Sequence, residues 1–489
     1  MSVAALLLGL AWALQPEPPV PDGPVRTTGE LTGATGPEPS TPAPSALGAG
    51  GRSRRVPAAA VVADVPASWS RIAAQAEQWP SPTTPPAAER ELALPTVPAS
   101  RMRDTLGLNI DVWRTEGGYR DFAPLLAKAT ELRLRHARVG MQASGQHGLA
   151  RMQQLGEIGV RLDVTMGDAL GRYNTTPFRR LDRRLHRNLL PFVDSVEGTN
   201  EPDLAGRADW AVRAKGHQGS VVQSVQAERG RPVAVIAPSV GRIANTGVLG
   251  RYAGLADAAN AHAYSSAGEP SVPLDQWTQA LAGQVPGGRP IVITEAGFQT
   301  DVGQTKYHTP LPAEIGASYV PRIVLEAMRR GMPRVYLYEM ADRWADPFGV
   351  DTAAHFGLLD AELKPKPAWT SLVRLQRALL DGGAPARAVV PLRARVVRGP
   401  ADLRALAFRR EDGTAALALW RAVSEWDNQA LLPTPPQPAA VEVDLPAGAV
   451  AAGGALATDI ATGKRQRLSD PRRVSLELTG APIVLTGLR

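Results

Sequence analysis

The stretch Pro290-Ile291-Val292-Ile293-Thr294-Glu295-Ala296-Gly297 is a short apolar run that ends on a carboxylate. An amphipathic stretch over 312–330 follows it, stops at Gly331, and leads into a second apolar run over 334–340. Short apolar runs that alternate with longer amphipathic stretches predict strand–helix–strand units and a parallel sheet. Gly331 supports the helix, because glycine readily adopts the left-handed conformation found just after a helix ends.

The same alternation continues from residue 105 to residue 380. Eight apolar runs are present: Leu106–Val112, His136–Gly140, Val160–Met166, Phe192–Glu197, Val233–Pro238, Asn260–Tyr264, Pro290–Glu295 and Arg334–Met340. The amphipathic stretches between them include Ala123–Leu134, Ala150–Ile158 and Ala208–Arg229. Eight such units match a closed barrel of about 250 residues, whereas an open doubly wound sheet usually carries a glycine-rich phosphate loop, which is absent. The sequence predicts an α/β fold, a (β/α)8 TIM barrel over residues 101–382.

The pattern changes after the barrel, where helical periodicity is lost. Two runs, Leu403–Arg409 and Ala415–Arg421, flank an Asp412-Gly413 pair, which is a strong hairpin signal. Apolar and polar residues alternate with a period of two over 441–445 and 474–478. Residues 383–489 are therefore predicted to form a small antiparallel β-sandwich domain. Packing against the barrel is its expected role, with sugar binding as the alternative.

The first hundred residues have a different composition. Residues 15–100 are rich in Pro, Gly and Ala and show no hydrophobic period, so we expect a largely disordered arm or linker. Residues 1–14 contain an apolar run, Val3–Leu14, with the small residues of Ala11-Trp12-Ala13 at its end. The run is too short for a membrane span, and no Lys or Arg precedes it. It predicts an export signal, hence a secreted or cell-envelope protein; an apolar tail without function is the alternative.

Composition excludes several classes of site. The chain has no cysteine, so disulfides, thiolate metal sites and a cysteine nucleophile are impossible. The seven histidines are scattered without metal-ligand spacing, and we expect no metal and no cofactor. The net charge of +7 is small for 489 residues. The basic stretch Arg179–Arg187 is interpreted as a solvated helix face, so no nucleic-acid partner is expected.

Two carboxylates stand where a barrel places its active site. Barrel enzymes carry their chemistry at the carboxyl ends of the strands. The fourth run leads into Asn200-Glu201-Pro202, and the seventh ends at Glu295. The fourth and seventh strands lie on opposite sides of a closed barrel, so these two side chains can face each other across its mouth. Paired carboxylates of this kind are what glycosidic bond cleavage requires, although acidic residues at strand ends also serve as loop caps.

These strand ends resemble those of the retaining glycoside hydrolases of clan A, the group that includes families 5 and 39. The resemblance covers residues 105–380. It implies that Glu201 is the acid/base, that Glu295 is the nucleophile and that Asn200 binds the sugar 2-hydroxyl. The sixth run contains His262-Ala263-Tyr264, similar to the His-x-Tyr of the clan. There the Tyr steadies the nucleophile and the His contacts the acid/base, while Arg138, at the end of the second run, supports the charge of the nucleophile.

The sequence departs from the clan at the end of the eighth run. Many members of the clan have a Trp there, but this chain has Tyr338-Glu339-Met340. We expect Trp344 or Tyr338 to provide an aromatic surface for the sugar. Two further carboxylates, Glu197 and Asp203, flank the same turn, and we expect neither to act in catalysis; Glu197 should point away from the site or cap a loop.

The sequence as a whole predicts an exported O-glycosyl hydrolase. Its expected partner is a β-linked oligo- or polysaccharide, which it would cleave with retention through a covalent intermediate. The alternative is a non-catalytic carbohydrate-binding or cell-envelope protein on the same barrel. The sequence does not indicate the sugar, the linkage or the oligomeric state.

Overall fold

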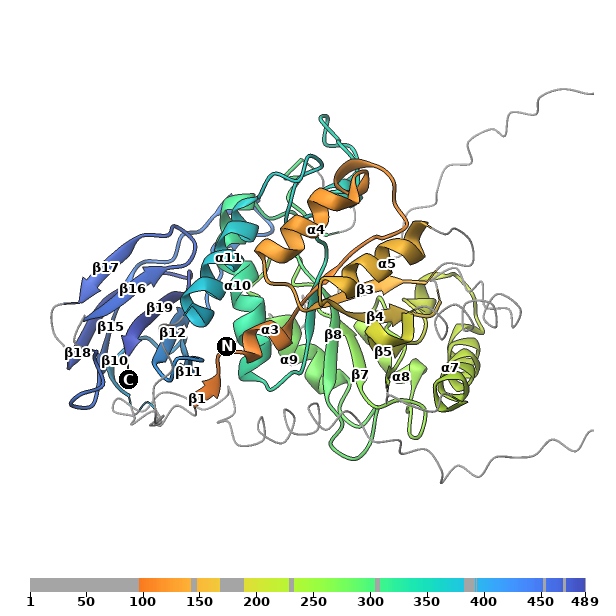
Figure 1. Ribbon diagram of the computed structural model, residues 1–489, viewed down its shortest axis with the longest axis horizontal. Helices are drawn as coiled ribbons and strands as arrows, with labels where there is room; N and C mark the ends of the chain where they lie inside the picture. Colours follow the sequence, from red (N-terminus) through yellow and green to blue (C-terminus); the bar gives the residue numbers. More distant parts are fainter. Residues whose placement is uncertain are drawn as a thin grey trace, which may run out of the picture. The chain divides into compact units, whose positions relative to one another are not determined.

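Eight short parallel strands form a closed barrel. They are β2 (Leu106–Asn109), β3 (His136–Gly140), β4 (Arg161–Thr165), β5 (Val193–Glu197), β6 (Ala234–Ile236), β7 (Ala259–His262), β8 (Ile291–Ala296) and β9 (Val335–Leu337). The strand order is β6-β5-β4-β3-β2-β9-β8-β7. A parallel bridge between Ile236 and Ala258 joins the two ends of this order and closes the barrel. The predicted (β/α)8 barrel is confirmed (Figure 1).

This computed structural model describes residues 96–141, 147–167, 189–227, 233–303, 308–381, 392, 394–451, 454–468 and 472–488. The apolar run at residues 3–14 and the basic stretch at 179–187 lie outside them. Within the described residues, no helix is both long and apolar enough to span a membrane.

Helices join the barrel strands. The α-helices are α3 (Arg101–Thr105), α4 (Phe122–Glu131), α5 (His147–Glu157), α7 (Trp210–Ala227), α8 (Thr246–Leu249), α9 (Ser271–Ala280), α10 (Ala313–Arg329) and α11 (Pro367–Leu380). The 3-10 turns are η1 (Gly117–Tyr119), η3 (Leu190–Phe192), η4 (Pro202–Leu204), η5 (Ile243–Asn245) and η6 (Thr352–Ala354). Helix α10 is followed by Gly331 at a φ of 67°, as its sequence predicts. All its residues from Gly316 to Met328 are buried, because the second domain covers the side that the barrel leaves open.

The second domain consists of two main sheets. A six-stranded sheet has the order β1 (Thr96–Pro98), β11 (Leu403–Arg409), β12 (Ala415–Arg421), β19 (Ile483–Leu488), β16 (Ala455–Asp459) and β17 (Arg465–Leu468). A three-stranded sheet contains β10 (Arg395–Arg398), β15 (Ala439–Asp444) and β18 (Arg473–Leu478). A short hairpin pairs β13 (Trp426–Asp427) with β14 (Leu432–Pro433).

The hairpin expected around Asp412-Gly413 is present, with β11 and β12 in antiparallel register from Leu403↔Arg421 to Arg409↔Ala415. Strand β1 differs from expectation. Its residues were assigned to the linker, but they pair in parallel with β11 and so belong to the sheet of the second domain. A strand of three residues is too short to show the alternation of apolar and polar residues by which a strand is recognised in a sequence.

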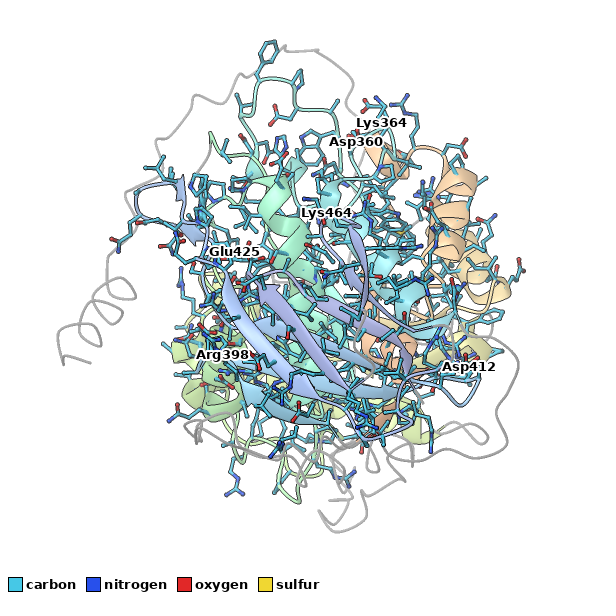
Figure 2. The ribbon with its side chains drawn as sticks, turned by 90° about the vertical axis from the view of Figure 1, so that its left-hand side faces the viewer. Asp360, Lys364, Arg398, Asp412, Glu425 and Lys464 are labelled. Carbon is cyan, nitrogen blue, oxygen red and sulfur yellow. The ribbon has the colours of Figure 1, made fainter. Side chains whose placement is uncertain are left out.

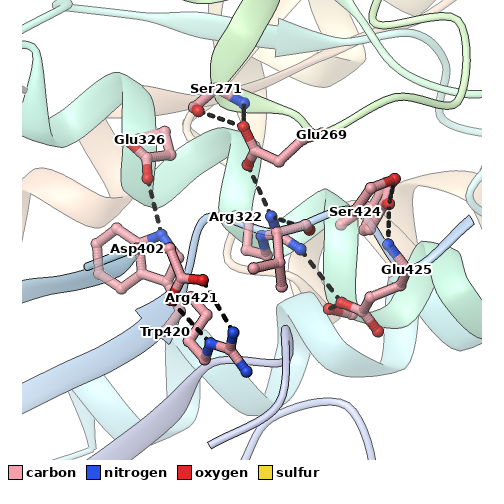
Figure 3. Close-up of polar contacts among 12 residues, drawn as sticks. Glu269, Ser271, Arg322, Glu326, Asp402, Trp420, Arg421, Ser424 and Glu425 are labelled. Carbon is pink, nitrogen blue, oxygen red and sulfur yellow. Dashed lines mark hydrogen bonds and ion pairs between the residues drawn. The ribbon is translucent and has the colours of Figure 1, made fainter. Parts of the chain in front are cut away.

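Polar contacts join the two domains (Figure 3). The Trp420 indole donates a hydrogen bond of 2.8 Å to Glu326 of α10, and the indole is fully buried. Burial acts to raise the pKa of Glu326, but the charges of Arg330 and Arg329 outweigh it and bring the pKa down to about 2. A buried carboxylate needs such partners, because an unpaired charge in an apolar interior costs several kcal/mol.

The second domain has an open groove of about 640 Å³, lined by strands of both sheets. Its lining includes the charged residues Arg398 and Lys464, both labelled in Figure 2. None of the described residues that line it is aromatic. Sugar-binding surfaces usually present aromatic rings, so the groove gives no support to a carbohydrate site in this domain.

Candidate active site

Glu295 and Glu201 reach the same place from opposite sides of the barrel. Glu295 lies near the end of β8, in the strand itself. Glu201 lies just after β5, at the start of η4, and its backbone is left-handed, with φ 44° and ψ 52°. A residue other than glycine rarely adopts this conformation, which is strained and concentrated at functional sites. Here it turns the chain out of the strand direction directly before Pro202.

His262, the last residue of β7, lies between the two carboxylates. Its Nδ1 is 2.6 Å from Oε1 of Glu201 and 3.6 Å from Oε2 of Glu295. One carboxylate oxygen of each glutamate and one nitrogen of His262 all lie within 4.8 Å of one another. The resemblance predicted that these three side chains share a site, and the barrel brings them together.

Arg138, the middle residue of β3, lies beside them and is 6% exposed. Its Nη1 donates to Oε1 of Glu295 at 2.6 Å and to Oδ1 of Asn109 at 2.9 Å. Its Nη2 donates to Oδ1 of Asn200 at 2.6 Å. With its Oδ1 on the guanidinium, Asn200 keeps its Nδ2 hydrogens for another acceptor.

The prediction for Glu197 is wrong. This carboxylate is 1% exposed and accepts hydrogen bonds from Arg138 Nε at 2.6 Å, from Asn260 Nδ2 at 3.0 Å and from the Thr165 hydroxyl. Glu197 lies two residues after Ser195 on β5, so both side chains point into the barrel. The alternation along the strand was a signal for this direction.

Asp203 caps a loop. Its oxygens accept hydrogen bonds from the backbone N–H groups of Gly241 and Arg242, at 2.9 and 3.1 Å, and from the Asn245 side chain at 2.9 Å. It fixes the loop after β6.

The surroundings hold Glu295 in its ionised form. Burial acts to raise the pKa of Glu295, but the charges of His262 and Arg138 and the hydrogen bond from Tyr264 outweigh it and lower the pKa. The Tyr264 hydroxyl donates to Oε2 of Glu295 at 2.7 Å. For His262, burial acts to lower the pKa, but the charges of Glu295 and Glu201 outweigh it and raise the pKa.

Aromatic side chains pack around Tyr264. Tyr338 lies with its ring centre 6.4 Å from that of Tyr264, and Phe356 lies 6.1 Å away. His308 stacks on Tyr264 at 4.6 Å. Tyr338 is thus the aromatic residue that the end of the barrel brings to the site, while Trp344 contacts Arg114, whose guanidinium lies 4.9 Å from its ring centre. Sequence reasoning did not identify His308.

No protein-family model matches the sequence, and no curated protein matches it. Solved structures do. A family 39 glycoside hydrolase from the gut symbiont Bacteroides cellulosilyticus WH2 is similar with a TM-score of 0.57 and 13% identity, over 81% of this chain and 83% of that one. The chain has the fold of the barrel glycoside hydrolases.

Two further glycosidases share this fold. A glucosidase from Croceicoccus marinus has a TM-score of 0.53 at 9% identity, over 82% of this chain and 98% of that one. A monomeric beta-xylosidase from Caulobacter crescentus CB15 has a TM-score of 0.50 at 16% identity, over 81% and 98%. The resemblance to clan A is consistent with these neighbours, and at such identities the likeness concerns the fold.

Two groups of described residues bring three ligating atoms within 4.8 Å of one another. One is Glu201, His262 and Glu295, the three side chains described above. The other is Asp301, Asp346 and His355, in loops after β8 and β9. Asp346 Oδ2 there accepts hydrogen bonds from the backbone N–H groups of Val350 and Asp351, so loop bracing accounts for this carboxylate.

Replacing Glu197 by Gln should destabilise the protein, because the neutral amide leaves Arg138 with less compensating charge. Removing one partner from a buried ion pair costs about 3–5 kcal/mol, and an isosteric amide that keeps part of the hydrogen bonding should cost less, about 2 kcal/mol. Urea unfolding would measure this change against Glu116→Gln, a matched exchange at an exposed glutamate. Equal stabilities of the two variants would contradict the role assigned to Glu197.

Proposed function

We propose that the protein is a retaining glycoside hydrolase for β-linked carbohydrates, with Glu295 as nucleophile and Glu201 as acid/base. The spacing of the two carboxylates carries the proposal. One carboxylate oxygen of Glu201 lies within 4.8 Å of one carboxylate oxygen of Glu295. Carboxyl groups are about 5–5.5 Å apart in retaining enzymes and about 6.5–9.5 Å apart in inverting ones, which need room for a water molecule. Nearest oxygens within 4.8 Å of each other agree with the retaining spacing.

The environment of Glu295 suits a nucleophile. Its side chain is 10% exposed, and both oxygens accept hydrogen bonds, from Arg138 and from Tyr264. Charged and polar donors of this kind keep the carboxylate ionised in a site that excludes most water. They also hold its orientation, so that attack on the anomeric carbon requires little reorganisation.

The environment of Glu201 suits a group that exchanges protons. Its side chain is 21% exposed, twice the value for Glu295, so water can reach it. The contact with Nδ1 of His262 involves Oε1, which leaves Oε2 for the glycosidic oxygen. A group that first donates and then accepts a proton needs this access to substrate and water.

The reaction would run in two steps. In the first, Glu295 attacks the anomeric carbon while Glu201 gives its proton to the glycosidic oxygen, and the bond to the leaving group breaks. The charge of Glu295 is then lost in the ester. In the second, the Glu201 carboxylate takes a proton from water, and that water displaces Glu295 from the anomeric carbon. Two inversions give net retention.

The supporting residues would act through position. Arg138 orients Glu295 and, through its hydrogen bond, the Asn200 amide. The Nδ2 group of Asn200 is then available for the sugar 2-hydroxyl, the contact implied by the resemblance to clan A. Hydrogen bonds to this hydroxyl strengthen as the transition state forms and contribute several kcal/mol in glycosidases.

Replacement of either glutamate by Gln should separate their roles. Glu295→Gln should lower kcat by roughly 10³-fold or more on every substrate, because no other group can form the ester. Glu201→Gln should slow alkyl or sugar leaving groups by about 10²–10⁴-fold and nitrophenolate much less, since nitrophenolate leaves without a proton. Release of sugar from a panel of aryl and oligomeric β-glycosides would measure both, with the exposed Glu314→Gln as a control.

Proton NMR of the first sugar released would identify the stereochemical outcome. Retention of the β-anomer is expected. Initial release of the α-anomer would contradict the covalent mechanism. An active Glu295→Gln variant, or a wild-type protein that binds sugars and hydrolyses none of them, would favour the non-catalytic carbohydrate-binding alternative.

The pH profile should depend on Tyr264. The hydrogen bond from its hydroxyl lowers the pKa of Glu295, so Tyr264→Phe should raise that pKa and move the acidic limb of kcat/KM to higher pH. A hydrogen bond to a charged group contributes about 1.5–3 kcal/mol, which corresponds to a loss of about 10- to 100-fold on the acidic side. The matched control is Tyr252→Phe, because the buried Tyr252 hydroxyl has no hydrogen-bond partner among the described residues. An unmoved acidic limb in Tyr264→Phe would contradict this role.

A further inference from the structure

His308 lies in the segment between β8 and α10, close to the nucleophile in space. The segment is held by Gln299, which is fully buried. The Gln299 side chain donates to the His308 carbonyl at 3.1 Å and accepts from the Asp301 N–H at 2.7 Å. The Leu311 N–H donates to the Gln299 carbonyl at 2.9 Å. These bonds tie the backbone at His308 and at Leu311 to Gln299.

The imidazole ring of His308 is fixed by two aromatic neighbours. It stacks on Tyr264 with an interplanar angle of 28°, and it meets the edge of Phe356 at 5.8 Å and 88°. Tyr264 is the residue whose hydroxyl binds Glu295. The ring of His308 therefore lies on the nucleophile's side of the site.

The ring nitrogens of His308 are unoccupied. Neither nitrogen has a hydrogen-bond partner among the described residues. Neither nitrogen is fully buried, because His308 is absent from the fully buried polar atoms that lack a partner. Burial lowers the pKa of His308, although the charges of Glu201 and Glu295 oppose the change, so the ring is neutral at neutral pH. A neutral imidazole offers one N–H donor and one acceptor, which matches the hydrogen-bonding capacity of a hydroxyl group.

We propose that His308 is a specificity-determining residue, whose imidazole hydrogen-bonds a hydroxyl of the sugar ring that Glu295 attacks. The proposal rests on the glycosidase function proposed above. Stacking on Tyr264 already restricts the rotation of the His308 ring, so the hydrogen bond forms with little further loss of side-chain entropy. The alternative is that His308 only packs against Tyr264.

Two substitutions separate these roles, because each keeps one property of histidine. His308→Phe keeps a ring for Tyr264 and Phe356 but removes both nitrogens. His308→Gln keeps a donor and an acceptor but removes the ring. If the hydrogen bond matters, His308→Phe should lower kcat/KM by about 3- to 10-fold with an unchanged thermal midpoint, and His308→Gln should retain more activity. The reverse order of activities would overturn the proposal.

Deoxy substrates test the contact directly. The wild-type enzyme would be compared on an aryl β-glycoside that it hydrolyses and on the analogues that lack one ring hydroxyl at a time. A site built to bind a hydroxyl discriminates against the analogue without it. At one position other than C2, His308→Phe should lose the discrimination that the wild-type enzyme shows. Val302→Ala, at a half-exposed position in the same loop, is the control and should discriminate like the wild-type enzyme.

The outcomes distinguish the two proposals. If the wild-type protein hydrolyses none of the glycosides, the glycosidase function itself is contradicted. If it hydrolyses them and His308→Phe discriminates at every position like the wild-type enzyme, only the role of His308 is overturned.

Discussion

The charge of Arg138 constrains the end of the barrel where Glu201 and Glu295 meet. A guanidinium at 6% exposure is stable only if carboxylates and polar oxygens surround it. The partners come from separate elements: Asn109 from β2, Glu197 from β5, Asn200 from the turn after β5, and Glu295 from β8. Closing the barrel and assembling the site are therefore the same event, because the strands must pair in register before these groups can meet.

The second domain extends this support to the loop beyond Tyr264. The fully buried Arg322 of α10 donates to Glu269 of that loop at 2.7 Å and to Glu425 of the second domain at 3.2 Å (Figure 3). The Asn428 side chain also donates to the carbonyl of Ser266, at 3.2 Å. The loop that follows Tyr264 thus connects to both domains.

The sequence predicted those features that depend on local pattern. The eight apolar runs became eight strands, and the strand ends identified Glu201, Glu295, His262, Tyr264 and Arg138, which the structure brings together. Side-chain direction at the end of a strand was harder to predict. Glu197 was expected to point away from the site. It lies two residues after Ser195 on β5, so it points to the same side, and it binds Arg138 inside the barrel. Asn109 and Asn260 also point into the barrel. The sequence did not predict their role, because single amides within apolar runs have no distinctive spacing.

Contacts between remote loops could not be predicted. His308 follows Glu295 by thirteen residues in a segment without hydrophobic period, and only the tertiary fold shows that it stacks on Tyr264. Similarly, the choice between Tyr338 and Trp344 as the aromatic residue at the site depended on how the loop after β9 folds back through Phe356. Such loop positions differ between proteins of one fold, so the barrel alone does not determine the substrate.

The covalent intermediate is the central claim, and trapping it is the most direct test. A 2-deoxy-2-fluoro β-glycoside with a good leaving group slows hydrolysis of the glycosyl ester, so the intermediate accumulates and can be detected by intact mass and peptide mapping. The account predicts one added glycosyl group on the peptide that contains Glu295, released when the ester turns over. Labelling of Glu201 in place of Glu295, or hydrolysis of natural glycosides without any adduct and with inversion, would contradict it.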